Sequence, residues 1–299
     1  MIVLTEGSTA YNQVSLVVKK FGWLEKEFQA DAVPVKWIQS QGSNRALEYL
    51  NSGSLDFGST AGLAAVLSKA NGNPIQAIYV YARPEWASLV VTKNSPISSV
   101  KELKGKKIAA TKGTDPYLFL LRTLHTAGLK KSDVEILHLQ HADGRIALER
   151  GDVAAWAGLD PHTAASQLQA GSRLIYRNIE FNTYGFLNTS ESFAKKYPEV
   201  VGRVIKVYEQ GRKWAIEHSD ELAQLISEEA KIPLNVAKLQ LSRVDFSDPI
   251  PSETHVKALK AAAPILVDEE LVKKGTDVNK IIDDLVIAHF AANQIHRAF

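Results

Sequence analysis

The sequence of 299 residues contains no cysteine, so disulfides, thiolate metal sites and cysteine nucleophiles are all excluded. An excess of charge of one sign is also missing, because 35 basic and 33 acidic residues leave a net charge of only +2. Without a basic stripe or tail, nucleic acid is not expected as a partner. Apolar runs stay well short of the ~20 residues that span a bilayer.

Motifs of catalysis and nucleotide binding are absent too. The sequence has no G-x-S-x-G, no G-x-x-x-x-G-K-S/T and no G-x-G-x-x-G. His138 and His141 lie near Glu135 and Asp143, but the segment is predicted to be a strand, on which residues three apart face opposite sides. We therefore expect no catalytic residues, no metal site and no cofactor.

A leader for export is not visible. Residues 2–5 already predict a strand, with no basic and apolar leader before them. If the protein is exported, we expect this sequence to be the mature form, with Met1 added or retained.

What the sequence does contain is a regular alternation of short apolar runs and amphipathic stretches. Strands are expected at residues 2–4, 33–38, 55–57 and 76–81, and again at 88–92, 107–110, 135–139, 154–156 and 174–176. Helices are expected between them at 14–20, 44–50, 61–70, 100–103, 116–127, 143–150 and 161–170. The remainder is predicted to be helical, at 192–196, 198–218, 220–229, 234–241, 252–266 and 278–290.

Strands that alternate with helices predict βαβ units and mostly parallel, mixed sheets. Because the pattern starts again after about residue 87, we expect an α/β fold of two lobes. Lobe I is predicted to comprise residues 1–84 plus 185–299, with a helical C-terminal part, and lobe II residues 85–184. Crossing strands near residues 82–87 and 178–188 would leave a ligand cleft between the lobes of a monomer.

Several segments carry a family resemblance. Residues 51–58 are NSGSLDFG, residues 95–109 are SPISSVKELKGKKIA and residues 151–161 are GDVAAWAGLDP. Together with QGS at 41–43 and KGT at 112–114, they resemble the aliphatic sulfonate, taurine and nitrate family of ABC transporter substrate-binding proteins, which have the type II periplasmic binding protein fold. The sequence departs from this family at residues 6–9, which include Ser8, and at Leu159, both where the ligand would sit.

The resemblance implies a periplasmic protein that captures a small organic anion, most simply an alkanesulfonate, and delivers it to a membrane permease. Nitrate, taurine and pyrimidine-like solutes are alternatives within this class. A small-molecule lyase or synthase on the same fold is an alternative from another class. The related synthases need a cysteine-rich iron-binding motif, and a lyase would need an acid–base pair that the sequence does not offer.

Three strand-to-helix turns are predicted to hold the anion, because open α/β sheets bind ligands at the carboxyl ends of their strands. Backbone N–H groups and hydroxyls at helix N-termini suit an oxyanion. The alternative is that Ser43, Ser59, Thr60 and Thr114 are only helix N-caps. The turn residues are Gln41, Gly42 and Ser43, then Ser59 and Thr60, then Gly113, Thr114 and Asp115.

Other candidates come from single residues near these turns. Arg83 offers a planar fork of donors to an anion; the alternatives are a solvated surface arginine or a hinge salt bridge with Glu85. Trp86 and Trp156 could wall the site against the organic part of a ligand, and Tyr117 lies at the same rim. Asp160 is expected to cap the helix that begins at Pro161, or to accept a hydrogen bond from a ligand amine or hydroxyl.

Overall fold

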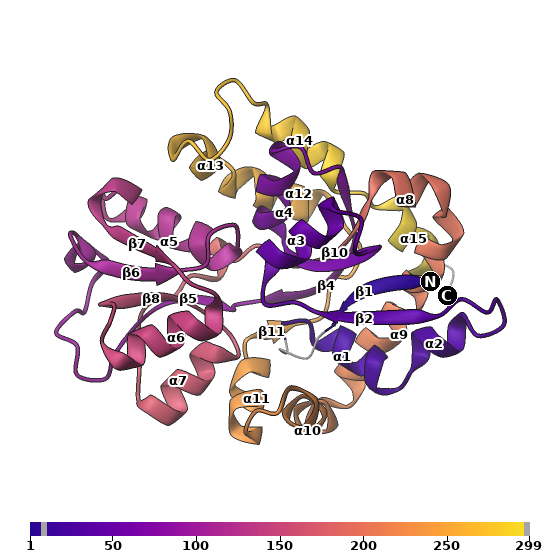
Figure 1. Cartoon of the computed structure of the whole chain (residues 1–299), viewed down its shortest axis with the longest axis horizontal. Helices are drawn as coiled ribbons and strands as arrows, with labels where there is room; N and C mark the ends of the chain where they lie inside the picture. The colour runs from indigo at the N-terminus through magenta and orange to yellow at the C-terminus, as the bar shows by residue number, and fades with distance from the viewer. Residues whose placement is uncertain (7–10, 296–299) are drawn as a thin grey trace.

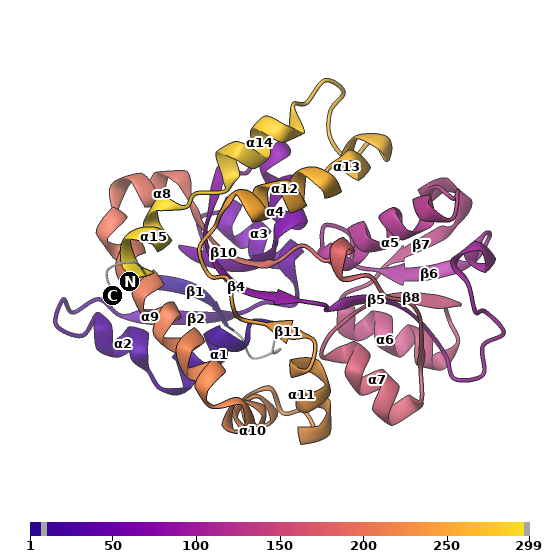
Figure 2. The same cartoon turned by 180° about the vertical axis from the view of Figure 1, so that it is seen from behind.

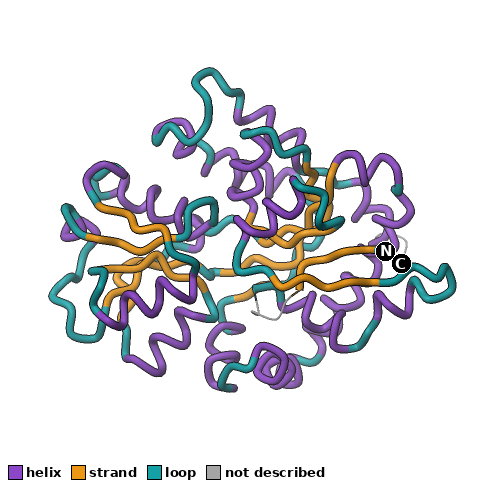
Figure 3. The backbone as a smooth tube through the Cα atoms, in the orientation of Figure 1, coloured by secondary structure: helices purple, strands orange, loops and turns teal. Residues whose placement is uncertain are grey.

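A computed structural model describes residues 1–6 and 11–295. Figures 1 and 3 show two α/β lobes side by side, with strands passing between them through the middle of the molecule. We call the lobe around the six-stranded sheet the first lobe and the lobe around the five-stranded sheet the second lobe. The predicted α/β fold with two lobes is confirmed.

The first lobe has strand order β11-β4-β10-β3-β1-β2. Its parallel pairs are β1–β2 and β1–β3, whereas β10 runs antiparallel to β3 and β4, and β11 antiparallel to β4. The central position of β10 means that a strand from late in the chain completes a sheet begun by the first residues. The strands are β1 (Ile2–Glu6), β2 (Val35–Gln39), β3 (Phe57–Ala61), β4 (Ile75–Pro84), β10 (Gly185–Ser190) and β11 (Val244–Asp245).

The second lobe has strand order β7-β6-β8-β5-β9. Strand β6 is parallel to β7 and β8, and β5 is antiparallel to β8 and β9. Every residue of β5 and β8 is buried, as expected for strands covered by helices on both faces. The strands are β5 (Ala87–Val91), β6 (Lys107–Ala110), β7 (Glu135–His138), β8 (Ala155–Leu159) and β9 (Arg173–Tyr176).

Helices cover both faces of each sheet. Figure 1 shows α3, α4, α12 and α14 on one side of the first sheet and α1 and α9 on the other; in the second lobe, α5 lies opposite α6 and α7. The helices before residue 185 are α1 (Gln13–Lys20), α2 (Trp23–Glu27), α3 (Ser43–Asn51), α4 (Gly62–Ala70), α5 (Asp115–Thr126), α6 (His141–Arg150) and α7 (His162–Ala170). Later ones are α8 (Glu191–Lys196), α9 (Pro198–Glu217), α10 (Ser219–Ala230), α11 (Leu234–Leu241), α12 (Glu253–Ala262), α13 (Pro264–Asp268), α14 (Val278–Leu285) and α15 (His289–Ile295). Short 3-10 helices are η1 (Val100–Leu103), η2 (Lys131–Asp133) and η3 (Ile179–Phe181).

C-terminal helices of the first lobe reach the second lobe. Helix α11 packs against α7, and α13 packs against α5. Figure 2 shows both contacts from behind. Within the described residues, no helix combines the length and the apolar character needed to cross a membrane.

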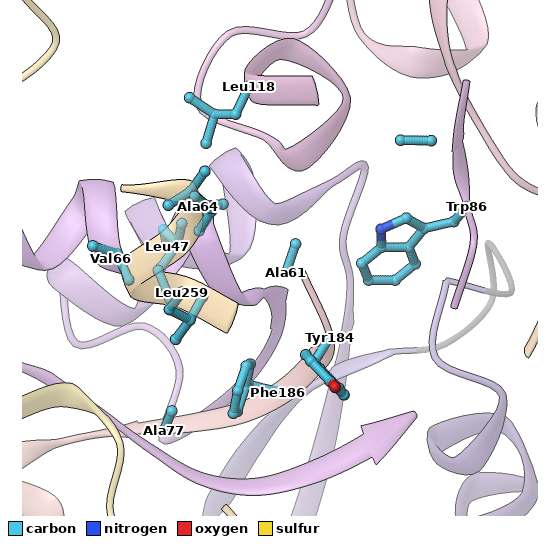
Figure 4. Close-up of a cluster of buried hydrophobic side chains, with 14 of the residues drawn as sticks. Leu47, Ala61, Ala64, Val66, Ala77, Trp86, Leu118, Tyr184, Phe186 and Leu259 are labelled. Carbon is cyan, nitrogen blue, oxygen red and sulfur yellow. The ribbon is translucent and has the colours of Figure 1, made fainter. Parts of the chain in front are cut away.

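One hydrophobic cluster includes buried side chains from both lobes. In Figure 4, Leu118 of α5 lies near Ala64 of α4, and Phe186 of β10 lies below α4 with Leu259 of α12. Burial of one such leucine or phenylalanine stabilises the fold by about 1.5–3 kcal/mol. The shared cluster therefore stabilises the contact between the lobes as well as the interior of each lobe.

Some predicted boundaries were wrong. The strand predicted at residues 55–57 is instead β3 (Phe57–Ala61), which is paired on both sides by β1 and β10. The helix predicted at 252–266 divides before Pro264, which has no N–H to continue the hydrogen-bond ladder. The helix predicted at 278–290 divides at Val286, which is extended and bridges to Ala77.

Candidate functional site

A cavity lies between the lobes, where α3 and β3 of the first lobe face α5 and α6 of the second. Its volume is about 470 Å³, counted out to its opening to solvent. Seven of the predicted ligand residues line it: Gly42, Ser43, Ser59, Thr60, Trp86, Thr114 and Asp115. Leu159, which the family resemblance placed where the ligand would sit, lines it as well. Sequence reasoning missed the other lining residues, which are Tyr11, Asn12, Ser40, Ala61, Tyr81, Pro116 and His141.

Two helix N-termini meet at this cavity without side-chain caps. Helix α3 follows Gly42, and α5 follows Thr114; neither N-cap residue provides a side-chain hydrogen bond to its helix. The hydroxyl of Thr114, predicted as a cap, instead donates to the carbonyl of Thr111 at 2.6 Å. Uncapped first turns carry backbone N–H groups and partial positive charge, which favour a bound anion.

The other predicted caps are also engaged elsewhere. Ser43 is the first residue of α3, and its hydroxyl accepts a hydrogen bond from the N–H of Ala61 at 3.0 Å. Thr60 lies in β3, where its hydroxyl accepts from Asn188 and donates to the carbonyl of Ala61. Because β3 continues to Ala61, Ser59 and Thr60 are strand residues, and the capping interpretation was wrong for both.

Helix α4 differs from α3 and α5 because its first turn is already occupied. The N–H of Leu63 donates to the hydroxyl of Thr183 at 2.8 Å, and the N–H of Gly62 donates to carbonyls of the same crossing segment. The structure therefore places two open helix N-termini at the cavity, although the sequence predicted three equivalent turns.

Asp115 links the start of α5 to both crossing segments. Its carboxylate accepts hydrogen bonds from the indole N–H of Trp86 at 3.1 Å and from the N–H and hydroxyl of Thr183. Burial raises the pKa of Asp115, although these three bonds oppose the shift. Trp86 is thereby fixed with its indole against the cavity, and Figure 4 shows this ring turned towards Ala61.

Arg83 lies at the end of β4, outside the set of residues that line the cavity. Its guanidinium forms an ion pair with Glu180 of η3 at 2.9 Å and lies 5.4 Å from the centre of the Tyr184 ring. The alternative of a salt bridge between Arg83 and Glu85 was wrong, because Glu85 pairs with Arg177. The ion pair of Arg83 joins the two crossing segments to each other.

Asp160 is held by protein groups on both sides. One carboxylate oxygen accepts a hydrogen bond from the N–H of Ala164 at 3.0 Å, so the predicted capping of α7 is confirmed. The guanidinium of Arg243, which follows α11, donates to both oxygens at 3.0 Å, and it also donates to Gln167. Burial raises the pKa of Asp160, and Arg243 opposes this shift.

The remaining predicted ligand residues do not line the cavity. Trp156 is only 1% exposed and packs against Gly144 inside the second lobe. Tyr117 is buried in the core, and burial raises its pKa. Gln41 and Gly113 flank lining residues, and Ser8 lies outside the described residues.

Tyr11 and His141, which sequence reasoning missed, bring two further polar side chains to the cavity. The hydroxyl of Tyr11 forms a hydrogen bond with Nε2 of His162 at 2.8 Å, and burial lowers the pKa of His162 to about 4. His141 is the first residue of α6, which begins two residues before the helix predicted at 143–150. The interpretation that His138 and His141 share one strand was therefore wrong, because β7 ends at His138. The rule of strand carboxyl ends that selected Gly42 and Thr114 would have selected His141 at that boundary.

The chain is similar to known proteins over most of its length. The family model described as "NMT1/THI5 like" matches residues 19–222. A protein of Bacillus subtilis (strain 168) named for binding aliphatic sulfonates is 30% identical, over 91% of this chain and 83% of its own length. A protein of Escherichia coli (strain K12) with the same name is 29% identical, over 89% of this chain and 84% of its own length.

Solved structures show the same fold. The alkanesulfonate-binding protein SsuA of Xanthomonas axonopodis pv. citri, bound to MOPS, has a TM-score of 0.85 and 25% identity, covering 94% of this chain and 96% of that one. The periplasmic aliphatic sulphonate binding protein SsuA of Escherichia coli has a TM-score of 0.79 and 27% identity, covering 96% of this chain and 91% of that one.

An enzyme also has this fold: the desulfurization enzyme DSZB has a TM-score of 0.70, but its 14% identity shows the fold alone. The relatives at higher identity are binding proteins, which places this chain among binding proteins rather than enzymes. The family predicted from the sequence motifs is confirmed, and the chain belongs to the NMT1/THI5-like family of periplasmic-type substrate-binding proteins.

Proposed function

We propose that this protein captures an alkanesulfonate between its two lobes and delivers it to the permease of an ABC importer. The observation that carries the proposal is the cavity between the lobes, where the uncapped N-termini of α3 and α5 meet. Two such N-termini provide neutral donors for an anion that stays charged at every physiological pH. The names of the relatives from Bacillus subtilis and Escherichia coli support the same ligand class.

The shape of the cavity supports an organic anion over nitrate. Its wall includes the apolar surfaces of Ala61, Trp86 and Leu159, beside the polar groups at the helix N-termini. Taurine and nitrate remain the alternatives within the class, and a periplasmic location and a monomeric state belong to the same proposal.

The division into lobes is part of the mechanism. We place the boundaries at residues 1–84 plus 185–299 and at 85–184, in agreement with the membership of the two sheets. The ligand would contact α3 from one lobe and α5 from the other. Because the ligand would bind more tightly when both contacts are made, it would shift the equilibrium from the open to the closed arrangement of the lobes.

Ser43, at the start of α3, brings to the cavity a hydroxyl that can donate to the sulfonate. Its oxygen already accepts the N–H of Ala61, so its own hydrogen can be donated to a ligand. Thr60 and Thr114, by contrast, donate to backbone carbonyls. Removal of one charge-assisted hydrogen bond costs about 1.5–3 kcal/mol.

The test is calorimetric titration of ligand-stripped protein with nitrate, sulfate and a series of alkanesulfonates. We expect affinity to rise with tail length, and we expect Ser43→Ala to weaken sulfonate binding by about tenfold or more. Ser52→Ala, at the exposed opposite end of α3, is the matched control and should leave the affinity unchanged. Binding of nitrate alone, or of none of these anions, would overturn the proposal.

A further inference from the structure

His141 brings a hydrogen-bond acceptor to the cavity that neither the motifs nor the comparisons identify. Its side chain is fully buried and lines the cavity from the start of α6. A Cβ added to Gly42 would lie 2.9 Å from Nε2 of His141. This edge of the imidazole therefore faces the beginning of α3, across the boundary between the lobes.

Hydrogen bonds fix which ring nitrogen carries the proton. The hydroxyl of Thr111 must donate to the carbonyl of Leu139, 2.7 Å away, because a carbonyl oxygen can only accept. The same hydroxyl lies 3.1 Å from Nδ1 of His141, so Nδ1 must be the donor in that contact. In the neutral ring the proton is then on Nδ1, and Nε2 presents a bare lone pair.

This lone pair has no partner among residues 1–6 and 11–295, and neither does the buried Oδ1 of Asn44. Both atoms lie beside Gly42: the position of an added Cβ is 2.9 Å from Nε2 and 3.1 Å from Oδ1. A buried acceptor without a hydrogen bond carries a free-energy cost, because it has lost its contact with water. A donor that reaches Nε2 or Oδ1 removes this cost for the atom it binds.

Protonation of His141 itself is an unfavourable way to supply the donor. Burial, with the charges of His162 and His138, lowers the pKa of His141 to about 3. The ring therefore stays neutral at physiological pH, and a donor group on a ligand in the cavity can supply the hydrogen.

We propose that His141 is a specificity-determining residue, which accepts a hydrogen bond from an O–H or N–H group on the organic part of a bound sulfonate. This inference rests on the proposed function and refines it. The sulfonate would be held by the N-termini of α3 and α5, and the donor on its tail by Nε2 of His141. Asp160, the acceptor considered from the sequence, is already bound by Arg243 and Ala164.

Three sulfonates of nearly equal shape test this role. 2-Hydroxyethanesulfonate, taurine and propane-1-sulfonate carry a hydroxyl, an ammonium and a methyl group at the same position. In calorimetric titrations of the wild-type protein, we expect at least one of the two donor-bearing ligands to bind tenfold or more tightly than propane-1-sulfonate. Comparison of the affinities for 2-hydroxyethanesulfonate and taurine shows whether the site prefers a neutral hydroxyl or a charged ammonium as the donor.

Two variants assign the effect to Nε2. In His141→Asn the amide can still donate to Thr111 but lacks an acceptor at the position of Nε2, so the preference for the donor-bearing ligand should disappear. In His141→Gln an amide oxygen can reach that position, and the preference should largely return. Thermal unfolding checks that each variant is folded.

The possible results separate the two proposals. Equal affinity of the wild-type protein for all three ligands, or tighter binding of propane-1-sulfonate, would overturn the role of His141 and leave the sulfonate function standing. Uptake of one proton per ligand, measured in buffers of different ionisation enthalpy, would also overturn it. If none of the three ligands binds, the proposed function itself fails.

Discussion

At the scale of the residue, Gly42 controls how closely α3 approaches α6. Its φ is 154°, and a Cβ at this position would lie 2.9 Å from His141 and 3.1 Å from Asn44. We expect Gly42→Ala to push these side chains into the cavity and to lower sulfonate affinity by tenfold or more. Calorimetric titration measures the loss.

Gly53, which follows the other end of α3, provides the matched control. Its φ is 74°, and an added Cβ would meet nothing within 4 Å. Gly53→Ala should therefore destabilise the protein by about 1 kcal/mol through backbone strain, with unchanged affinity. Equal losses of affinity in both variants would contradict the role given to Gly42.

Residues at turns were predictable from the sequence, whereas their partners were not. Gly42, Ser43 and Thr114 were found because polar residues at the carboxyl ends of strands can be read along the chain. The ion pair of Asp160 joins it to a residue 83 positions away, Arg243, and no local pattern indicates such a contact. For the same reason the partner of Arg83 in the second crossing segment was missed.

At the scale of the element, the N-terminus of α7 couples stability to pH. His162 is its first residue and is hydrogen-bonded to the hydroxyl of Tyr11, and burial lowers the pKa of His162 from 6.5 to about 4. Between these values the unfolded chain binds the proton more readily than the folded one. The contribution of His162 to the free energy of unfolding is therefore fully present above about pH 6.5, and it is lost as the pH falls towards 4.

The variant His162→Gln isolates this contribution. Glutamine can still form a hydrogen bond with the hydroxyl of Tyr11, but its side chain does not titrate. We expect its unfolding temperature to fall less than that of the wild-type protein between pH 6.5 and pH 4, as measured by thermal denaturation. Asp115 and Asp160, whose pKa values are raised by burial, act equally in both proteins. Parallel curves would contradict the assignment to His162.

Most helices and strands could be predicted because hydrophobic periodicity is a local signal. Strand β10 was expected only as a crossing segment, since its place between β3 and β4 depends on pairing across more than one hundred residues. Strand β11, with two residues, is too short to show a period. Helix α2, with five residues, is also short for this kind of pattern.

At the scale of the whole molecule, the ion pair between Arg243 and Asp160 joins the C-terminal part of the first lobe to the second lobe. Both side chains are at least nine-tenths buried, and the pair lies where α11 packs against α7. Removal of one partner from a buried pair typically costs about 3–5 kcal/mol, because the other charge is left uncompensated. The double variant Arg243→Met with Asp160→Asn avoids that penalty.

We expect the double variant to fold, to bind sulfonate about tenfold more weakly and to have a larger radius of gyration without ligand. These changes would follow if the ion pair favours the closed arrangement of the lobes. Small-angle X-ray scattering and calorimetry measure both quantities. The variant Arg45→Met with Glu48→Gln removes an exposed pair on α3 and serves as the control. Unchanged scattering and affinity in the double variant would show that the ion pair has no part in closure.

The central position of β10 also dictates an order of assembly. Strands β3 and β4 are neighbours only through β10, so the first sheet stays divided until residues 185–190 have joined it. The sheet of the second lobe comes entirely from residues between 87 and 176, which precede β10 in the chain. Long-range pairing closes slowly because its loop entropy must be overcome first. During vectorial synthesis, the inserted lobe should therefore mature before the lobe that contains the N-terminus.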